Sequence, residues 1–531
     1  MKNGYGSDFS SMNRRQFGKI LAGSAGGFAL GLSGCRSISD PLVHPKAEER
    51  LYETGAPISG ALTVDVVVVG AGLSGLTAAR MLAKQNKTVL LLESRDRIGG
   101  RMYLKSTLDG AVLDMGGQWV GDSQEAILNL LDELRISRFL SYAEGRSIHS
   151  WNGVKTSFDG DVAKLLEGNC SKPNLSTFAD KRACIAPQTP LSGCARNNAQ
   201  TNLWNKFISL SQSLSPDRPW QANGAKILDE MTFQSWLESE GAGKYSRWLG
   251  GMLSRIGGSG GFEPDEVSLL HMAWTQRVAP QSEAPEKWLI NGGAGQIPAI
   301  LANQLKKSIV LSAHVHAIEQ NSTGVTIRTR GLKVRAKRVI VAVPPPLRAG
   351  IAFSPALPPT HSGFIQRSPM GSISKVHAVY PDAFWRKQCL SGVGVGNLQS
   401  CEFIADSSPE SGKPGILTSF VAGERNIELS NKSIAEVKNL VLTDFAQFLG
   451  PEVWKPAQFI HIDWNKEKWT SGAFTTYLPP GVWSTYGNGW RDPVRHIFWA
   501  GTETSERWPG YFDGAVRAGL RTAEEVRQSL L

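Results

Sequence analysis

The sequence predicts an α/β protein built on a doubly wound parallel sheet, and three observations near its first apolar strand carry this prediction. Residues 64–69 read VDVVVV, a β-branched run that suits a strand buried on both faces of a sheet. A glycine-rich turn at residues 70–75 follows directly, and residues 76–85 then show a helical pattern. A second apolar run at residues 88–92 predicts another strand. Strand, turn, helix and strand in this order open a doubly wound sheet.

Elements of both kinds follow along the chain. Between residues 203 and 279 helical patterning dominates, with several tryptophans. The C-terminal segment predicts a strand at residues 497–500, a glycine turn and a helix over residues 514–530. A chain of 531 residues is too long for one hydrophobic core, so we expect two lobes. Further strands are expected at residues 308–312, 325–329, 338–343, 374–380 and 415–421.

The N-terminal segment predicts export. Residues 13–19 read NRRQFGK, which resembles a twin-arginine motif, and residues 20–34 are rich in Gly, Ala and Leu. This stretch is shorter than the roughly 20 residues that span a bilayer as a helix, so a signal peptide over residues 1–35 is favoured over a membrane anchor. It ends Leu-Ser-Gly-Cys, like a lipobox, so Cys35 would be lipidated; the alternative is an ordinary cleaved signal. We therefore expect a periplasmic protein or a membrane-anchored lipoprotein.

The charge and the cysteines exclude some classes of function. The formal net charge is +10, but the basic residues are scattered and accompany no nucleic-acid-binding motif, so no nucleic-acid partner is expected. The cysteines form no CxxC pair, and no histidine spacing indicates a metal site. An oxidising destination permits disulfides, for example among Cys170, Cys184 and Cys194 or between Cys389 and Cys401. The odd number of cysteines beyond the signal leaves at least one unpaired in a monomer.

The glycine-rich turn carries the first functional signal. Gly70, Gly72 and Gly75 form a G-x-G-x-x-G pattern between the expected strand and helix. Such glycines permit a tight turn, let the backbone approach a diphosphate and aim a helix N-terminus at its negative charge. Glu93 ends the second strand about twenty residues further on, where an acidic side chain can bind a ribose. Together they predict a dinucleotide site, without choosing between FAD and NAD.

Two segments extend this site. Residues 93–101 read ESRDRIGGR, in which arginines such as Arg95 and Arg101 can neutralise a diphosphate and Gly100 lets the backbone lie against a ligand. An exposed charged loop is the alternative interpretation. Residues 114–121 read DMGGQWVG, whose small residues again admit a ring system.

These ordered blocks resemble the flavin monoamine oxidase family, which is related to polyamine and putrescine oxidases and to L-amino-acid oxidases. The resemblance runs from about Val64 to Leu531, although residues 160–200 have no clear counterpart. It implies a monoamine-oxidase-like fold, in which a doubly wound, Rossmann-like FAD-binding domain carries an α+β substrate domain. We expect a linker at residues 36–61, the FAD-binding domain at 62–142, 291–350 and 467–531, and the substrate domain at 143–290 and 351–466.

The resemblance also implies which residues wrap FAD. Residues 291–296, NGGAGQ, resemble a glycine-rich return into the FAD domain, after which Val315 aligns with a residue whose backbone meets the adenine. Residues 500–516 resemble the family's closing motif, in which Glu503 and the start of the last helix hold the ribityl and diphosphate groups. The expected FAD-binding residues are Gly70, Gly72, Gly75, Glu93, Arg95, Gly100, Arg101, Gly116, Gly117, Gln118, Trp119, Val315, Gly501, Glu503, Gly510 and Ala515.

Four further positions match the family's catalytic apparatus. Lys375, in a GSISK segment, would lie near flavin N5 through a water, and its burial should lower its pKa; a surface charge is the alternative. Phe474 and Tyr511 align with two aromatic residues that face each other before the flavin. The family usually has tyrosine at both places, so Phe474 departs from it, and ordinary core aromatics are the alternative. Trp464 matches a tryptophan beside the flavin.

Two absences refine the expected activity. Ala473 stands where mammalian monoamine oxidases have the cysteine that binds flavin, so FAD should be noncovalent. The arginine that L-amino-acid oxidases place against the substrate carboxylate is missing at residues 116–119, which favours a simple amine. Arg255 or Arg277 could replace that arginine.

The resemblance therefore implies oxidative deamination of a small-molecule amine. Hydride would pass from the α-carbon of the neutral amine to the flavin, and water would hydrolyse the imine to a carbonyl compound. Oxygen is the expected electron acceptor, giving hydrogen peroxide. An L-amino-acid oxidase or dehydrogenase of the same fold is the nearest alternative. A desaturase, a porphyrinogen oxidase and a non-catalytic exported FAD-binding lipoprotein are the others.

Overall fold

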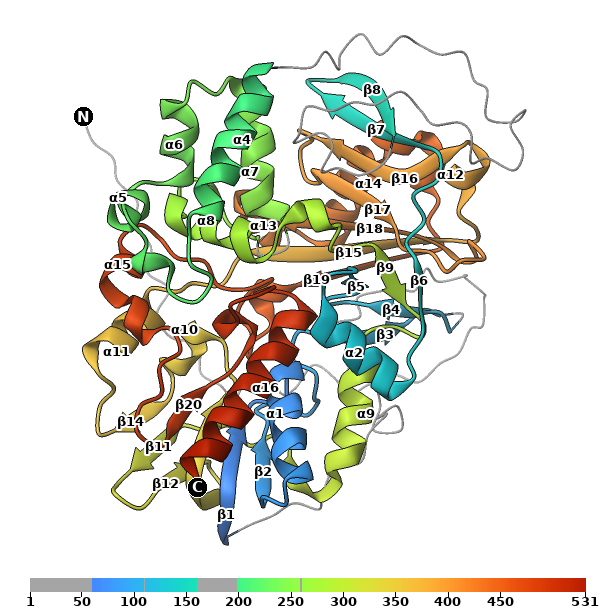
Figure 1. Cartoon of the computed structure of the whole chain (residues 1–531). Helices are drawn as coiled ribbons and strands as arrows, with labels where there is room; N and C mark the ends of the chain where they lie inside the picture. The colour runs from blue at the N-terminus through green and yellow to red at the C-terminus, as the bar shows by residue number, and fades with distance from the viewer. Residues whose placement is uncertain (1–59, 109, 160–197, 258–259) are drawn as a thin grey trace, which may run out of the picture. The chain divides into compact units, whose positions relative to one another are not determined.

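The computed structural model describes residues 60–108, 110–159, 198–257 and 260–531. The expected twin-arginine signal, Cys35 and the linker lie outside these residues, as do Cys170, Cys184 and Cys194. Two large sheets organise the described chain, and helices pack on both of them (Figure 1).

The first sheet has a parallel centre that matches the expected strand–turn–helix–strand unit. Its order is β10-β2-β1-β13-β12-β11-β14, and β20 also pairs with β13. Strand β1 is parallel to both β2 and β13, β2 is parallel to β10, and β13 is parallel to β20. Strand β12 is antiparallel to both β11 and β13. The strands are β1 (Gly60–Val69), β2 (Val89–Leu92), β10 (Ile309–Val310), β11 (Ala317–Gln320), β12 (Val325–Arg328), β13 (Leu332–Val341), β14 (Ala352–Ser354) and β20 (Ile497–Trp499).

The valine run of β1 is buried on both faces, as its composition predicts. Val66 and Val68 pack into one core with the helices, whereas Val67 and Val69 pack into a second core with β11, β12 and β13. Helix α1 begins at Leu73, three residues earlier than its pattern indicates, because it starts directly after the glycine turn. The helices of the first core are α1 (Leu73–Lys84), α2 (Glu125–Leu134), α9 (Gln296–Leu305) and α16 (Phe512–Ser529).

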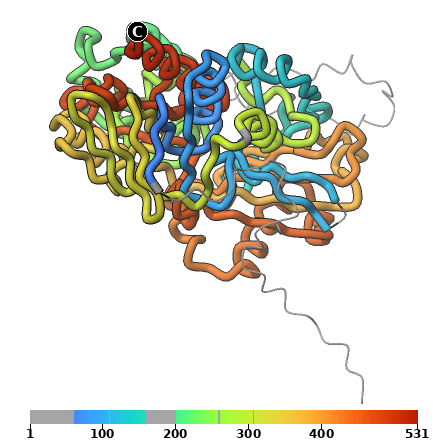
Figure 2. The backbone as a smooth tube through the Cα atoms, turned by 90° about the horizontal axis from the view of Figure 1, so that it is seen from below, coloured from blue at the N-terminus to red at the C-terminus, as the bar shows by residue number. Residues whose placement is uncertain are grey.

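The two ends of the described chain meet on this sheet. The C-terminal α16 lies beside α1, as the red and blue segments of Figure 2 show. A Cβ at Gly519 of α16 would lie 2.5 Å from the carbonyl oxygen of Ser74, so only glycine admits this close packing.

The second sheet forms the other lobe, with the order β19-β15-β18-β17-β16-β7-β8. Every residue of β15 and β18 is buried, and α14 (Ile434–Leu449) packs against this sheet. Its strands are β7 (Arg146–Trp151), β8 (Val154–Asp159), β15 (Ile373–Tyr380), β16 (Leu390–Gly396), β17 (Phe403–Asp406), β18 (Gly415–Ala422) and β19 (Gln458–Asp463).

The helical region that residues 203–279 predict packs around a tryptophan-rich core. Its helices are α4 (Asn198–Gln212), α5 (Ala225–Glu230), α6 (Phe233–Ser239), α7 (Lys244–Ile256) and α8 (Leu269–Val278). Smaller elements connect the lobes: β3 (Leu104–Ser106), β4 (Val112–Asp114), β5 (Trp119–Val120), β6 (Arg138–Leu140), β9 (Trp288–Ile290), α10 (Pro345–Arg348), α11 (Pro359–Gln366), α12 (Phe384–Lys387), α13 (Glu424–Ser430), α15 (Val482–Tyr486) and the 3-10 turn η9 (Thr502–Thr504).

The suggested pairing of Cys389 with Cys401 is wrong. Cys389 is disulfide-bonded, but Cys401 is a free thiol buried in the core of the second sheet. The residue lies at the entrance to β17, where its side chain packs among apolar neighbours rather than facing another cysteine.

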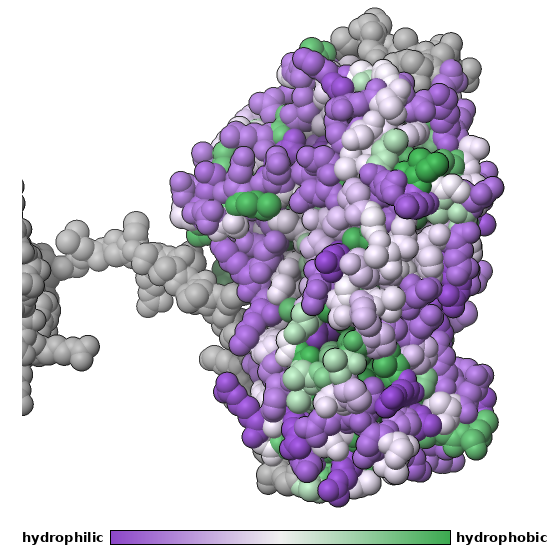
Figure 3. Space-filling model, turned by 90° about the vertical axis from the view of Figure 1, so that its left-hand side faces the viewer, coloured by the Kyte–Doolittle hydropathy of each residue, from purple (hydrophilic) through white to green (hydrophobic). Residues whose placement is uncertain are grey.

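The surface is mostly hydrophilic. On the face that Figure 3 shows, hydrophobic side chains form small separate groups. Within the part of the chain that the structure describes, no helix combines the length and apolar character needed to cross a membrane.

Candidate active site

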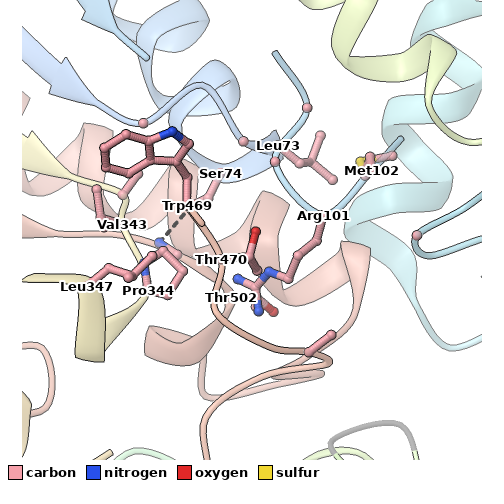
Figure 4. Close-up of a pocket in the computed structure, with 18 of the residues that line it drawn as sticks. Leu73, Ser74, Arg101, Met102, Val343, Pro344, Leu347, Trp469, Thr470 and Thr502 are labelled. Atoms are coloured by element: carbon pink, nitrogen blue, oxygen red, sulfur yellow. Dashed lines mark hydrogen bonds between the residues drawn. The ribbon is translucent and has the colours of Figure 1, made fainter. Parts of the chain in front are cut away.

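A cavity of about 560 Å³ lies at the carboxyl ends of β1, β2, β13 and β20. This is the edge at which doubly wound sheets bind their ligands. Figure 4 labels residues from each of the five segments that surround most of it. These segments are residues 69–74, 93–102, 342–351, 464–474 and 501–515.

The glycine turn after β1 forms one wall of this cavity. Gly70 has a φ of +103°, and a Cβ at Gly75 would lie 2.0 Å from the Gly70 carbonyl oxygen, so both positions require glycine. A Cβ at Gly72 would meet nothing within 4 Å, because this residue faces the open cavity. No side chain caps the N-terminus of α1, which leaves its N–H groups available to an anion.

Glu93 lies at the end of β2, buried at the cavity wall. Its carboxylate accepts hydrogen bonds of 2.7 Å from the Ala71 N–H and 3.0 Å from the Arg95 N–H. Arg95 pairs with Glu93 at 3.2 Å and with Glu467 at 3.3 Å. The carboxylate is thus held at the place where a strand-end acid meets a ribose.

A second turn closes the cavity from the C-terminal side. The Gly501 N–H donates to the Ser74 hydroxyl at 3.0 Å, which ties this turn to the start of α1. Arg101 Nη1 lies 2.7 Å from Glu503 Oε1 and donates to the Phe474 carbonyl at 2.6 Å. The Glu503 carboxylate has no aligned hydrogen bond of its own, so Arg101 holds it as an ion pair.

Lys375 is the buried cation of the cavity wall. Its ammonium donates to the carbonyl oxygens of Asp114 at 2.7 Å and Gly116 at 2.8 Å, and to the side-chain oxygen of Gln118. Burial lowers the pKa of Lys375 to about 7, the direction that its expected place in the site predicts. Three acceptors use all three N–H donors of the ammonium, so these contacts stabilise the charged form against burial.

Two further titratable groups lie beside Lys375. Burial raises the pKa of Asp114 to about 6, although its carboxylate accepts from the Ala294 N–H at 2.8 Å and the Gly295 N–H at 3.1 Å. Burial also lowers the pKa of His377 to about 3, so this imidazole is neutral near pH 7. His377 is hydrogen-bonded to the Asp114 carbonyl at 3.1 Å and to the Thr418 hydroxyl at 2.8 Å.

Aromatic side chains form the remaining wall. Phe474 lies edge-to-face with Phe420 at 5.0 Å between ring centroids, and both line the cavity. Trp464 lines it too, and its indole donates to the Met115 carbonyl at 3.1 Å. Tyr511 packs edge-to-face on Trp508 at 5.1 Å. Polarisable rings on several sides suit a planar cofactor and an amine.

The hydroxyl of Tyr511 connects the aromatic wall to an acidic side chain. It donates to Glu286 Oε1 at 3.1 Å and accepts from Gln281 Nε2 at 3.3 Å. Burial, with Glu286 beside the ring, raises the pKa of Tyr511 well above its usual value. A carboxylate therefore stands next to one of the two expected substrate-facing rings.

The structure brings most of the expected residues together. Gly75, Gln118, Trp119 and Glu503 lie behind the wall rather than in it. Gln118 and Trp119 contact the Lys375 ammonium, and Glu503 pairs with Arg101. The expected residues in the wall are Gly70, Gly72, Glu93, Arg95, Gly100, Arg101, Gly116, Gly117, Val315, Lys375, Trp464, Phe474, Gly501, Gly510, Tyr511 and Ala515.

Neither arginine considered for a substrate carboxylate lines the cavity. Arg255 is buried and donates to Glu402 at 2.6 Å and to Glu263 at 3.1 Å, so its charge is balanced within the protein. Arg277 is exposed on α8.

Several site residues escaped sequence reasoning. Asp114 and His377 flank the lysine, and Glu286 contacts Tyr511. At another part of the wall Trp469 packs against His314 in a tilted arrangement, with 4.6 Å between the ring centroids. Of these residues only Asp114 could have been found from the sequence, because it lies two positions before the glycine pair at residues 116–117.

The residues present fit FAD. The uncapped helix N-terminus, the strand-end Glu93 and the arginines Arg95 and Arg101 suit a dinucleotide, and the cavity extends from them to the lysine and the aromatic wall. Ala473 lines the cavity where a covalent link would need a cysteine.

Comparison with known proteins agrees with this geometry. The chain is 38% identical to an L-amino acid dehydrogenase of Synechocystis, over 87% of this chain and 94% of the relative. It is 30% identical to amine oxidase [flavin-containing] A of Bos taurus, over 88% of this chain and 85% of the relative. Among solved structures it resembles putrescine oxidase bound to putrescine, with a TM-score of 0.78 and 30% identity over 88% of this chain and 100% of that chain. It also resembles cyclohexylamine oxidase from Brevibacterium oxydans, with a TM-score of 0.78 and 29% identity over 88% of this chain and 99% of that chain.

The model of the family described as flavin containing amine oxidoreductase matches residues 73–527, which include all five cavity segments except residues 69–72. With FAD as its cofactor and a buried lysine beside an aromatic wall, this chain belongs to the flavin-containing amine oxidoreductases.

Proposed function

We propose that this enzyme oxidises a primary or secondary amine to an imine, which water hydrolyses to a carbonyl compound and ammonia or a smaller amine. The observation that carries the proposal is the position of Lys375, which lines one cavity with Phe474, Tyr511 and the dinucleotide turn. Bound FAD supplies the two-electron redox chemistry between the amine and oxygen, with hydrogen peroxide as the reduced product.

The residues of the chain supply orientation and a dry environment. Phe474 and Tyr511 both line the cavity, where their rings would orient a small amine whose reacting nitrogen is uncharged and would exclude water from it. Lys375 keeps a proton at Nζ between carbonyl acceptors, in a site where burial brings its pKa near 7. A group with a pKa near the working pH can hold or release that proton as the reaction requires.

The charges around the aromatic wall support an amine rather than an amino acid. Arg255 is neutralised by Glu402 and Glu263, and Arg277 is exposed away from the cavity. Glu286 places a carboxylate next to Tyr511, and this charge repels a substrate carboxylate but attracts a cationic amine.

Oxidation of L-amino acids is the second candidate, because the Synechocystis relative at 38% identity is named an L-amino acid dehydrogenase. Arg101 is the lining arginine that contacts Phe474, but its ion pair with Glu503 competes with a substrate carboxylate.

An anaerobic titration of the purified enzyme with a panel of amines and L-amino acids tests the proposal. Loss of the flavin absorbance with an amine, followed by recovery and peroxide formation in air, is the expected result. Bleaching by amino acids alone would transfer the enzyme to the second candidate. Bleaching without recovery in air would identify a dehydrogenase with another electron acceptor.

We further propose that the chain is exported by the twin-arginine route and is periplasmic or anchored through a lipid on Cys35. The motif NRRQFGK and the sequence LSGC before and at residue 35 support this proposal. Mass spectrometry of the mature N-terminus would distinguish a lipidated Cys35 from an ordinary cleavage.

A further inference from the structure

Arg348 is a buried cation that the proposed reaction does not use. It ends the short helix α10, and only 1% of its surface is exposed. Its Nε donates to the Val343 carbonyl at 2.8 Å and its Nη2 donates to the Ala500 carbonyl at 3.1 Å. The guanidinium also lies over the ring of Trp499, 5.0 Å from its centroid.

Arg348 differs from other buried or half-buried arginines in its lack of a carboxylate partner. Arg255 pairs with Glu402, Arg386 with Asp406 and Arg521 with Glu525. Among the described residues no ion pair reaches Arg348, and the carboxylate that acts on it most strongly, Glu503, is already paired with Arg101.

An unpaired buried guanidinium is unfavourable, because carbonyl dipoles replace only part of its lost hydration. Burial accordingly lowers the pKa of Arg348 to about 10. The group stays charged at physiological pH, so the folded protein carries an excess positive charge at this point.

The contacts of Arg348 place this charge directly behind the cofactor cavity. Strands β13 and β20 run parallel up to Val341 and Trp499, and the Ala500 N–H makes the next bond, to the Val341 carbonyl at 3.0 Å. Beyond this bond the segments that follow β13 and β20 separate, and both then line the cavity, through Val343 and Gly501. Arg348 donates to one carbonyl of each segment, those of Val343 and Ala500.

The peptide unit between Ala500 and Gly501 is fixed at both ends by these contacts. Its carbonyl accepts from Arg348, and its N–H donates to the Ser74 hydroxyl at the start of α1. Ser74 and Gly501 both line the cavity, next to the uncapped helix N-terminus that suits a diphosphate.

We propose that Arg348 is a positioning residue of the cofactor site, which holds the diverging ends of β13 and β20 in place and supplies a buried positive charge that the anionic diphosphate of FAD balances. The free protein then bears the unfavourable charge, and cofactor binding relieves it. The inference rests on FAD as the cofactor and is independent of which amine is oxidised.

The test compares Arg348→Met with the wild-type full-length enzyme loaded with FAD. Exhaustive dialysis removes FAD from both proteins, and titration of the FAD-free proteins with FAD, followed by flavin fluorescence, gives the dissociation constant. Circular dichroism gives the melting temperature of the FAD-free proteins. We expect Arg348→Met to weaken FAD binding about tenfold, the lower end of what loss of an outer-shell partner costs at metal sites. Its FAD-free form should melt at or above the wild-type temperature, because an unbalanced charge has been removed.

Arg521→Met is the matched control. Arg521 also donates to a carbonyl of this segment, that of Trp499 at 2.9 Å, but Glu525 balances its charge at 3.0 Å. Its loss should lower the melting temperature of the FAD-free protein and change FAD affinity much less. Arg348→Lys, which keeps the charge but not the two-carbonyl geometry, should retain FAD better than Arg348→Met.

Two results would overturn the proposal. One is unchanged FAD affinity in Arg348→Met; the other is a lower melting temperature of its FAD-free form, as in the control, which would indicate an ordinary structural arginine. Neither readout needs an amine, so failure of the proposed substrate class leaves this test intact.

Discussion

The Nζ of Lys375 lies 2.7 Å from the backbone carbonyl oxygen of Asp114, so the buried cation of the second sheet is bonded to the end of β4. The two residues are 261 positions apart in the chain. Because β15 carries the lysine in a fully buried strand, this bond fixes the ammonium relative to Gly116 and Gly117 in the cavity wall.

Removal of the Lys375 ammonium should slow the enzyme without releasing FAD. Lys375→Met keeps a chain of similar length, and the dinucleotide turn does not contact it. We expect the rate of flavin reoxidation by oxygen to fall about 100-fold, the typical loss for a positioned proton donor. Stopped-flow absorbance measures it, with the exposed Lys387→Met as control. An unchanged rate would show that the lysine only supports the fold.

Lys375 and Asp114 should also shape the pH dependence of stability. The folded pKa of Lys375 is about 7, below its usual value of 10.5, so the unfolded chain binds more protons between these values and stability rises with pH there. The folded pKa of Asp114 is about 6, above its usual 3.8, so the contribution of this group to stability falls as pH rises through that window. His377, whose folded pKa is about 3 against its usual 6.5, contributes a rise over the same window and offsets this fall.

Melting temperatures of FAD-free protein between pH 4 and pH 10 measure the pH dependence of stability. In Lys375→Met the rise in melting temperature above pH 7 should disappear. If the rise persists in this variant, other groups cause it.

Glu286 should select for cationic substrates. Glu286→Gln keeps a hydrogen-bond acceptor for Tyr511 and removes the charge. Because Glu286 is exposed, we expect only a two- to fivefold loss, about what exposed ion pairs contribute, in kcat/KM for diamines and little change for uncharged-tail monoamines. Glu283→Gln, whose carboxylate faces Arg507 at 3.7 Å, is the control. Equal losses for both amine classes would contradict a charge effect.

FAD should leave the protein on denaturation. Ala473 lines the cavity where a link would form, Cys401 is buried in the core of the second sheet, and Cys389 is already disulfide-bonded. Acid precipitation should therefore release all the flavin into the supernatant, where its absorbance measures it. A yellow pellet that survives washing would indicate a covalent bond.

The sequence predicted the parts of the site that local patterns determine. The valine run, the glycine turn and Glu93 follow one another within 30 residues, and all lie at the sheet edge as expected. Gln118 and Glu503 turned away from the cavity because a motif fixes which residues form a turn but not which side chain points inward. Gln118 reaches Lys375 and Glu503 reaches Arg101 instead.

Contacts between distant segments were beyond local patterns. His377 bonds the Asp114 carbonyl from 263 residues away, and Tyr511 bonds Glu286 from 225 residues away. Spacing alone suggested the pairing of Cys389 with Cys401, which is wrong because Cys401 is a free thiol buried in the core.

The bond between Ser74 and Gly501 has a consequence for biosynthesis. A ribosome finishes the dinucleotide turn early, but it makes the turn at Gly501, 427 positions after Ser74, much later. Nascent chains released before that point lack one side of the cavity and cannot retain the cofactor. Flavin colour therefore reports that synthesis has passed the turn at Gly501, and copies that stop before it would be colourless.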